Sequence, residues 1–298
     1  MRFKTTRLAP RTISSYESDF RTFGTWCRAA GRSALPASSH TVELYITELI
    51  ESGRKVTTAE RHAFAINHAH RDACLPSPYN EGVRQVIAGA RRLLCQMPAQ
   101  KDPIGLDDLK VMLIALGTET PIAKRDTALL LFGWATALRR SNLAALQLED
   151  LRFTPKGILV WVRNEKQDRE GNGRRVVVPY GKRKKTCPVR AIQRWLEARG
   201  DWSGPVFCHV MRGVPKQKPM LGNRIAQIVQ EAAANAGLPR HRYGAHSLRA
   251  GMATGGLEQG VSEVMIAQQT GHRSLETLRI YLRSRDPFRG NAVSQIGL

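Results

Sequence analysis

The stretch GHRSLETLRIYLR, residues 271–283, decides how the rest of the chain is interpreted. Gly271 is expected to end one helix and leave His272 in a turn, because glycine readily adopts the left-handed conformation that stops a helix. A second helix beginning near Ser274 is expected to carry Tyr281. Each side chain also has an ordinary explanation, as a turn histidine and as a half-buried aromatic residue. A catalytic role for this stretch can therefore be inferred only together with residues elsewhere in the chain.

An arginine pair ends an apolar segment upstream, in ATALRRSNLAAL, residues 135–146. We expect a helix to end near Arg139 and Arg140, and Ser141 to cap the next helix. A guanidinium at such a junction is held by packing and still suits a phosphate. A pair of surface arginines at a helix end is the alternative explanation.

The motif HSLR, residues 246–249, places a histidine and an arginine three positions apart. On a helix His246 and Arg249 then share a face, so an imidazole and a bidentate phosphate ligand point the same way. No acidic cluster with metal-ligand spacing accompanies them. Together with Tyr281, the set suits phosphoryl transfer in which arginines neutralise the transition-state charge. A tyrosine nucleophile has a free pKa of about 10, so it needs a base and a positive field.

The charge balance favours a polyanionic partner. The chain has 298 residues, with 46 Lys and Arg against 25 Asp and Glu, a net charge of +21. Residues 1–100 contain 14 basic and 8 acidic residues, and the remainder contains 32 and 17, so both parts are basic. Double-stranded DNA is the expected partner, because neutralising phosphates releases counterions. A basic protein without such a partner, or one on anionic membranes, is the alternative.

Cysteine usage and the lack of long apolar stretches favour a cytoplasmic, nucleoid-associated location. The five cysteines are odd in number and form no CxxC pair, which is typical of a reducing compartment. The N-terminus lacks an apolar signal region, and no apolar run reaches the roughly 20 residues of a membrane span. His62, His68 and His70 have near-helical spacing, but we do not expect them to form a metal site, and we expect no cofactor.

The expected organisation is a helical domain, a linker and a mixed domain. Residues 1–97 have helical periodicity, 98–105 contain proline and glycine without periodicity, and 106–298 form the second domain. In that domain ILVWVR (158–163) and RRVVVP (174–179) predict a hairpin with a long polar connection. The fold class is therefore mainly α with a small β-sheet. The expected helices span 12–96 in four segments, and then 106–116, 123–138, 188–198, 221–236, 246–258, 262–270 and 274–283.

The ordered set Arg139, Lys166, His246-x-x-Arg249, Gly271-His272 and Tyr281 resembles the tyrosine recombinases, the phage integrase family that includes Cre recombinase. The order and spacing match, including the nine positions from His272 to Tyr281. The resemblance covers nearly the whole chain. RNEKQDREGNGRRVVVP resembles the family's lysine-bearing β-hairpin.

The resemblance implies six catalytic residues acting on one phosphodiester: Arg139, Lys166, His246, Arg249, His272 and Tyr281. The arginines would bind non-bridging oxygens, and His272 would hydrogen-bond the phosphate. The lysine would protonate the leaving 5′-oxygen, and His246 would help to manage the tyrosine proton. The tyrosine would attack, giving a 3′-phosphotyrosine whose bond energy makes ATP unnecessary.

The resemblance also implies an assembly. A SAM-like core-binding domain and an α+β catalytic domain would form a C-shaped clamp on DNA. Four protomers would pair two recombination sites and pass through a Holliday junction. The 17 residues after Tyr281 would include a tail that docks on a neighbouring protomer. Accessory proteins and the target sequence cannot be inferred from the residues.

Two positions depart from a simple match. The family usually has Glu or Asp three residues after the first arginine, where this chain has Asn142, which brings no negative charge. Lys182, Lys184 and Lys185 follow the second strand and compete with Lys166 for the lysine role. We interpret that run as a solvated or phosphate-contacting face.

Two other functions fit parts of the pattern. A type IB topoisomerase-like enzyme would use the same chemistry as a monomer to relax DNA. A catalytically silent DNA-binding protein of the same fold would keep the charge and lose the reaction. The separate helical domain and the tail favour a site-specific recombinase over a topoisomerase-like enzyme. The intact residue set favours a recombinase over a silent DNA-binding protein.

Overall fold

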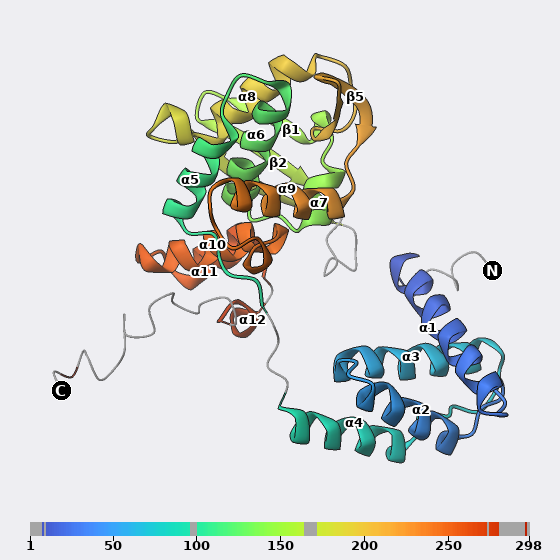
Figure 1. Ribbon diagram of the computed structural model, residues 1–298. Helices are drawn as coiled ribbons and strands as arrows, with labels where there is room; N and C mark the ends of the chain where they lie inside the picture. Colours follow the sequence, from blue (N-terminus) through green and yellow to red (C-terminus); the bar gives the residue numbers. More distant parts are fainter. Residues whose placement is uncertain are drawn as a thin grey trace. The chain divides into compact units, whose positions relative to one another are not determined.

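The computed structural model describes residues 8, 10–95, 100–163, 172–272, 274–279 and 296, which form two compact units (Figure 1). The units are Met1–Ala99 and Gln100–Leu298. Each unit has a hydrophobic core of its own. Lys166 and Tyr281 lie outside the described residues.

The first unit is built from helices. Helix α1 packs against α3, and α2 packs against α4. The side chains of Ser38 and Asn80 cap α2 and α4 by accepting from backbone N–H groups three residues on. Helix α1 begins at Pro10, and proline suits a first turn because its missing N–H would have no partner there. The helices are α1 (Pro10–Ala29), α2 (Ser39–Glu51), α3 (Val56–Asp72) and α4 (Glu81–Leu94).

A buried polar network crosses the core of the first unit. The Tyr45 hydroxyl lies 2.8 Å from His62 Nδ1, and His62 Nε2 lies 3.2 Å from Asp19 Oδ1. Arg61 Nε donates to Asp19 at 2.7 Å. His62 thus bonds to protein groups on both sides of its ring. Among the described residues no cluster of His, Cys, Asp and Glu could hold a metal ion.

In the second unit α6 runs through the core, with α5 and α8 beside it (Figure 1). Its residues 128–133 are apolar or glycine and buried on every side, which is why its sequence shows little amphipathic periodicity. Helix α10 packs against the same helix. The helices are α5 (Leu106–Leu116), α6 (Pro121–Thr136), α7 (Arg140–Ala145), α8 (Pro188–Arg199), α9 (Gly222–Asn235), α10 (Ala245–Glu258), α11 (Glu263–Thr270) and α12 (Leu275–Arg279).

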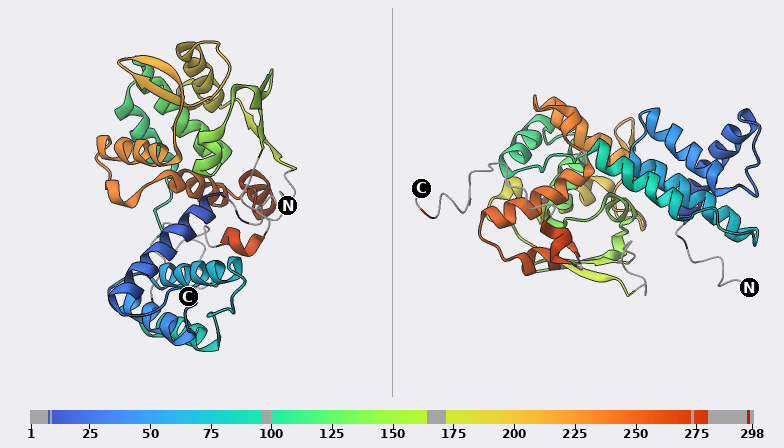
Figure 2. Two further views of the ribbon diagram at one scale, coloured as in Figure 1. Left: turned by 90° about the vertical axis from the view of Figure 1, so that its right-hand side faces the viewer. Right: turned by 90° about the horizontal axis from the view of Figure 1, so that it is seen from below.

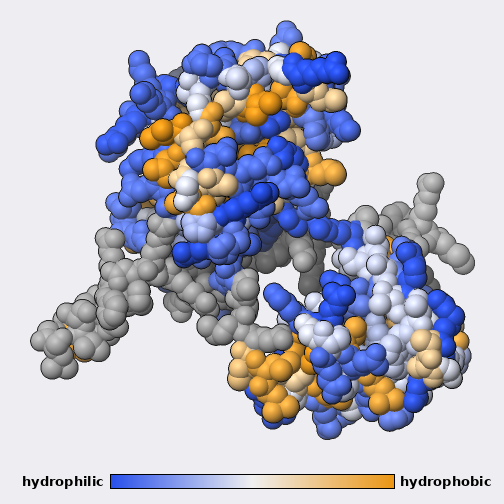
Figure 3. Space-filling view, viewed as in Figure 1, coloured by the Kyte–Doolittle hydropathy of each residue, from blue (hydrophilic) through white to orange (hydrophobic). Residues whose placement is uncertain are grey.

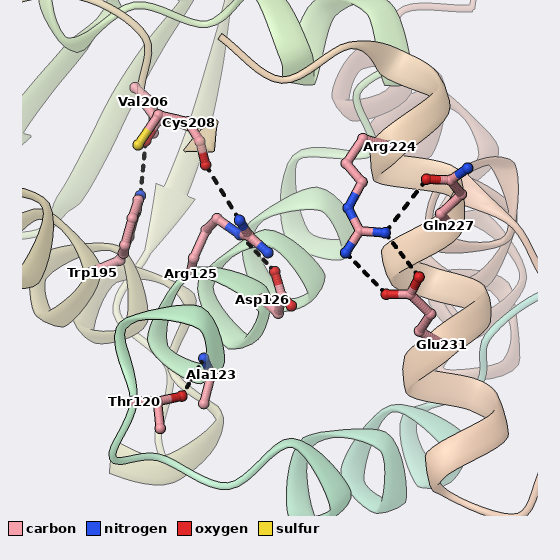
Figure 4. A network of polar contacts seen from close by, with 10 residues as sticks. All are labelled: Thr120, Ala123, Arg125, Asp126, Trp195, Val206, Cys208, Arg224, Gln227 and Glu231. Atoms are coloured by element: carbon pink, nitrogen blue, oxygen red, sulfur yellow. Dashed lines mark hydrogen bonds and ion pairs between the residues drawn. The ribbon is translucent and has the colours of Figure 1, made fainter. Parts of the chain in front are cut away.

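A buried ion pair on α6 contacts the strand that begins at Cys208 (Figure 4). Arg125 Nε donates to Asp126 Oδ1 at 2.7 Å, and Arg125 NH1 donates to the Cys208 carbonyl at 3.4 Å. Burial raises the pKa of Asp126, and the hydrogen bond from Arg125 opposes that rise. The positive charge of Arg125 and the negative charge of Asp126 therefore compensate each other, which is what makes their burial tolerable.

The predicted hairpin is confirmed. Strands β2 (Gly157–Val162) and β3 (Arg174–Pro179) pair antiparallel, with Val160 opposite Val176 and Val162 opposite Arg174. Strand β1 (Leu151–Thr154) adds a third strand that the sequence analysis did not predict. The hairpin lies at one side of the unit (left view of Figure 2). Its pairing brings residues 163 and 172, at the two ends of the polar connection, close together.

A second small sheet was also not predicted. Strands β4 (Cys208–Met211) and β5 (Val214–Pro219) pair antiparallel. The β5 sequence VPKQKP contains two prolines, which are tolerated because a two-stranded sheet leaves an open edge for positions without an N–H. Arg212 and Gly213 both have positive φ, 50° and 77°, as the turn of a two-residue hairpin requires.

The start of the second unit is anchored before α5. Asp102 N donates to the Arg242 carbonyl at 2.8 Å, and Ile104 N donates to the Ser247 carbonyl at 3.0 Å. The Ile104 carbonyl accepts from Trp134 Nε1 at 3.0 Å, and Ile104 is buried. The segment thus contacts α10 and α6, two of the helices that supply the site described below.

Hydrophilic side chains cover most of the face in Figure 3, and apolar residues form patches on both units. One patch lies at the C-terminal end of α4, where Leu93 is 86% exposed and Leu94 is exposed. Within the described part of the chain, no helix has both the length and the apolar character to traverse a bilayer.

Candidate active site

Three helix ends supply the candidate active site: the end of α6, the first turn of α10 and the end of α11. Ala137 ends α6 in the left-handed conformation, with φ of 51°. The chain then turns so that Arg139 is the N-cap residue of α7. Ser141 lies inside α7, so the expectation that it caps this helix is wrong. The turn places the partly buried Arg139 where the next helix begins.

Arg249 is the buried centre of the site, with 1% of its surface exposed. Its NH1 group donates to the Ala137 carbonyl at 2.7 Å and to the Thr270 carbonyl. Both carbonyls lie at helix C-termini, where the helix dipole is negative and favours a cation. The α6 and α11 ends therefore help to compensate the burial of this guanidinium.

His272 follows directly from the end of α11. Gly271 ends that helix with φ of 72°, which confirms the predicted stop and places His272 outside it. His272 Nε2 lies 3.0 Å from Arg249 NH2, and Nδ1 lies 2.7 Å from Thr270 Oγ1. The pKa of His272 is lowered to about 4, mainly because the ring is buried and secondly because Arg249 and Arg139 are positively charged. The imidazole is therefore neutral at physiological pH.

His246 lies in the first turn of α10, three residues before Arg249, as the sequence predicts. Its side chain reaches solvent. Desolvation by the surrounding protein atoms lowers its pKa, and the charges of Arg249, Arg139 and Arg140 lower it further. A neutral imidazole at the surface of the site can accept a proton.

The structure thus brings four of the six predicted residues together. Arg139, His246 and Arg249 all perturb the pKa of His272, which requires them to be close to it. Asn142, which replaces the family's usual acidic residue, is buried in α7, where Ser141 Oγ donates to its side-chain oxygen at 3.4 Å. The positions of Lys166 and Tyr281 fall outside the described residues.

Sequence reasoning missed Arg174 as part of this site. From β3, its NH1 group donates to the carbonyls of Gln268 and Gln269 at 3.3 and 3.1 Å, and NH2 donates to that of Thr270 at 3.2 Å. The sequence identified Arg174 only as a strand residue. Nothing in the linear pattern signals a contact across nearly a hundred residues.

Gln269 is a second residue that sequence reasoning missed. Its Nε2 group donates to the carbonyls of Ala135 at 2.7 Å and Val177 at 3.2 Å. One amide thus joins α6 and β3 to the end of α11. Together with Arg174, it fixes the end of α11 that carries His272.

Both ends of the connection between β2 and β3 are held by arginines. At the β2 end, Arg163 Nε donates to the buried Asp150 at 2.6 Å, and Arg163 also contacts Glu149. At the β3 end, Arg174 is bonded to α11. Arg163 and Arg174, on either side of this connection, are therefore both held by hydrogen bonds to the second unit.

Comparison with known proteins identifies the class. The sequence pattern of the phage integrase family matches residues 106–287, more than half of the chain. The chain therefore belongs to this family of site-specific tyrosine recombinases, which agrees with the site geometry.

Curated relatives are similar over nearly the full length. An integrase/recombinase xerD homolog from Selenomonas ruminantium is 31% identical over 293 residues, covering 97% of this chain and 86% of the relative. Tyrosine recombinase XerD from Yersinia pestis is 25% identical over 284 residues, covering 92% and 87%.

Solved structures confirm the fold. The integrase of transposon Tn1549, in complex with transposon right-end DNA, aligns with a TM-score of 0.66 at 16% identity, covering 98% of this chain and 95% of that chain. A lambda integrase dimer bound to a core site aligns with a TM-score of 0.64 at 15% identity, covering 96% and 93%. The fold class predicted from the sequence is thus confirmed.

Proposed function

We propose that this recombinase cuts and rejoins DNA through a covalent link between Tyr281 and a backbone phosphate. The observation that carries the proposal is the grouping of Arg139, His246 and the buried Arg249 around His272. Fixed guanidinium groups such as Arg139 and Arg249 stabilise the negative charge that develops when a phosphodiester is attacked. Because the fold already holds them in place, the reaction has no cost for reorganising them.

Each residue has a role in the proposed reaction. Arg139 and Arg249 bind the non-bridging oxygens of the scissile phosphate. His246, with its lowered pKa, accepts a proton as Tyr281 attacks. Lys166 protonates the leaving 5′-oxygen, and the anchoring of both ends of its connection by Arg163 and Arg174 supports delivery to one place.

His272 completes the proposed set. Its contact with Arg249 supports a place beside the scissile phosphate. The product of attack is a 3′-phosphotyrosine with a free 5′-hydroxyl. Attack by a partner strand's hydroxyl then gives a Holliday junction, and a second round resolves it without ATP.

Double-stranded DNA with paired recombination sites is the proposed substrate. The net charge of +21 supports it, and lambda integrase and the Tn1549 integrase have been solved on DNA. We assign DNA binding to the helical domain 1–97, and catalysis to 106–298 after the linker 98–105, with a C-shaped clamp on DNA. DNA affinity should fall steeply with salt. An affinity unchanged between about 50 and 200 mM salt would contradict this.

Tetramer assembly through the C-terminal tail is part of the proposal. A lambda integrase tetramer bound to a Holliday junction is among the similar structures. Deleting residues 286–298 should leave binding to one site intact and weaken pairing of two sites. Native gel shifts with one-site and two-site DNA measure both, and undiminished pairing would contradict a docking tail. We place the enzyme in the cytoplasm, with the nucleoid.

The decisive experiment traps the covalent intermediate. The protein is incubated with supercoiled plasmid carrying the DNA that flanks its coding region, and the reaction is stopped with detergent. We expect a protein–DNA adduct that Tyr281→Phe abolishes. No adduct from the unaltered protein would favour a catalytically silent DNA-binding protein. Adduct and relaxation without recombinant products would favour a topoisomerase-like enzyme.

A further inference from the structure

Thr270, the last residue of α11, has a fully buried hydroxyl that contacts three groups. Its Oγ1 lies 2.7 Å from the Ile266 carbonyl, 3.3 Å from the Ala267 carbonyl and 2.7 Å from His272 Nδ1. The family resemblance assigns this residue no role. Its hydroxyl links the end of α11 to His272.

The directions of these hydrogen bonds are forced by chemistry. A carbonyl oxygen only accepts, so the Thr270 hydroxyl donates its single proton to the Ile266 carbonyl. Its oxygen must then accept from His272 Nδ1, which therefore carries a proton. Arg249 only donates, so His272 Nε2 accepts from it through a lone pair. The opposite tautomer would set two donors against each other at 3.0 Å.

We propose that Thr270 is a positioning residue that holds His272 in the Nδ1–H tautomer. In this tautomer Nε2 accepts a hydrogen bond from Arg249 and fixes the guanidinium. His272 then contributes to strand cleavage through the placement of Arg249. This inference rests on the proposed function, and it replaces the expectation that His272 donates directly to the phosphate.

The charges around the ring agree with this assignment. Arg249, Arg139, His246 and Arg174 face His272 from α10, the α6–α7 junction and β3. These groups and burial disfavour a second proton on the imidazole. A neutral ring has one N–H, and the Thr270 hydroxyl determines which nitrogen has it. For Nε2 to donate to a phosphate, the proton would have to leave Nδ1 and the hydroxyl would have to turn.

The first test reads the tautomer directly in the full-length protein without DNA. Nitrogen NMR of histidine-labelled protein distinguishes the two ring nitrogens, and His272→Gln identifies the His272 signals. We expect Nδ1–H in the unaltered protein and in Thr270→Ser, and a mixture of tautomers in Thr270→Val. Nε2–H in the unaltered protein overturns the proposal.

A matched control separates this role from ordinary packing. Thr136, at the end of α6, is equally buried and donates to the Phe132 carbonyl at 2.7 Å, the same bond to the fourth residue back. Thr136→Val therefore removes a comparable hydroxyl without touching His272. We expect it to leave the His272 signals unchanged. An equal change in Thr136→Val and Thr270→Val overturns the proposal.

The second test measures single-turnover formation of the covalent DNA adduct. Thr270→Val should cleave about tenfold more slowly, the factor that one hydrogen bond supplies, with DNA affinity unchanged. Thr270→Ser should stay within about threefold of the unaltered protein. A Thr270→Val rate within about twofold, in a folded protein, overturns the proposal. If the unaltered protein forms no adduct, the proposed function fails, and the NMR result still decides the role of Thr270.

Discussion

Gly251→Ala should destabilise the second unit strongly, because α10 touches a backbone at this position. A Cβ built on Gly251 would lie 2.0 Å from the Ile104 carbonyl oxygen and 2.8 Å from the carbonyl carbon. Ordinary contact is about 3.4–4 Å, so the segment before α5 would have to move by more than an ångström. A backbone cannot rotate away as a flexible side chain can.

The cost follows from what this movement would break. Overpacking a filled site costs about 1–3 kcal/mol. The Ile104 N–H and carbonyl also bond to Ser247 and Trp134, at 3.0 Å each, and a net loss of about 1 kcal/mol for each is ordinary. We therefore expect a loss of about 3 kcal/mol in the free energy of unfolding. In a unit of this size that lowers the Tm by roughly 6–12 °C.

The same helix provides the control. A Cβ at Gly255 would meet its nearest atom, in Trp134, at 3.5 Å, which is ordinary contact. Gly255→Ala should therefore stabilise α10 by about 0.5–1 kcal/mol, since alanine restricts the unfolded chain. Thermal unfolding of both variants by circular dichroism measures the difference. Shifts of the same sign, or a Gly251→Ala change under about 1 kcal/mol, would refute the reasoning from contact distance.

Three further predictions concern the site. Arg174→Met removes donors to the α11 carbonyls and should slow DNA cleavage about tenfold. The control Arg175→Met, on the exposed face of the same strand, should cleave within about twofold of the unaltered protein. Equal cleavage rates for the two variants would show that Arg174 does not belong to the site. Arg249→Lys cannot reach both helix ends and should slow single-turnover cleavage by about 10²–10³, so a loss under tenfold would contradict its central role. The pKa of His272 is about 4 in the folded state and about 6.5 when unfolded, so stability should fall by about 2–3 kcal/mol as the pH drops from 7 to 4. Denaturant titrations across this range measure the loss, and a His272→Gln variant with an equally steep loss would exclude His272 as its source.

Local patterns in the sequence were sufficient for most elements. The stop at Gly271, the first turn of α10 with His246 and Arg249, and the β2–β3 hairpin each depend on residues adjacent in sequence, and all are present. The sequence also determined the family, because the order and spacing of a few chemical groups are specific even though each group alone is common.

Elements that depend on distant partners were not predictable in the same way. Strand β5, with two prolines and two lysines, is a strand only because β4 pairs with it. The cap of α7 depends on the turn at Ala137, whose left-handed conformation has no glycine to signal it. Tertiary context overrode local propensity at both places.

The sequence by itself predicted which chemical groups the site contains, because the order and spacing of residues can be compared without knowledge of the fold. Only the tertiary structure decided how those groups are held. Arg249 is stabilised where α6 and α11 end, Arg174 reaches α11 from β3, and Thr270 sets the proton of His272. The contacts of Arg249 and Arg174 end on backbone carbonyls, which every residue has, so no side-chain pattern can reveal them. Because these carbonyls and guanidinium groups are shielded from water, leaving any of them without a hydrogen bond would cost stability.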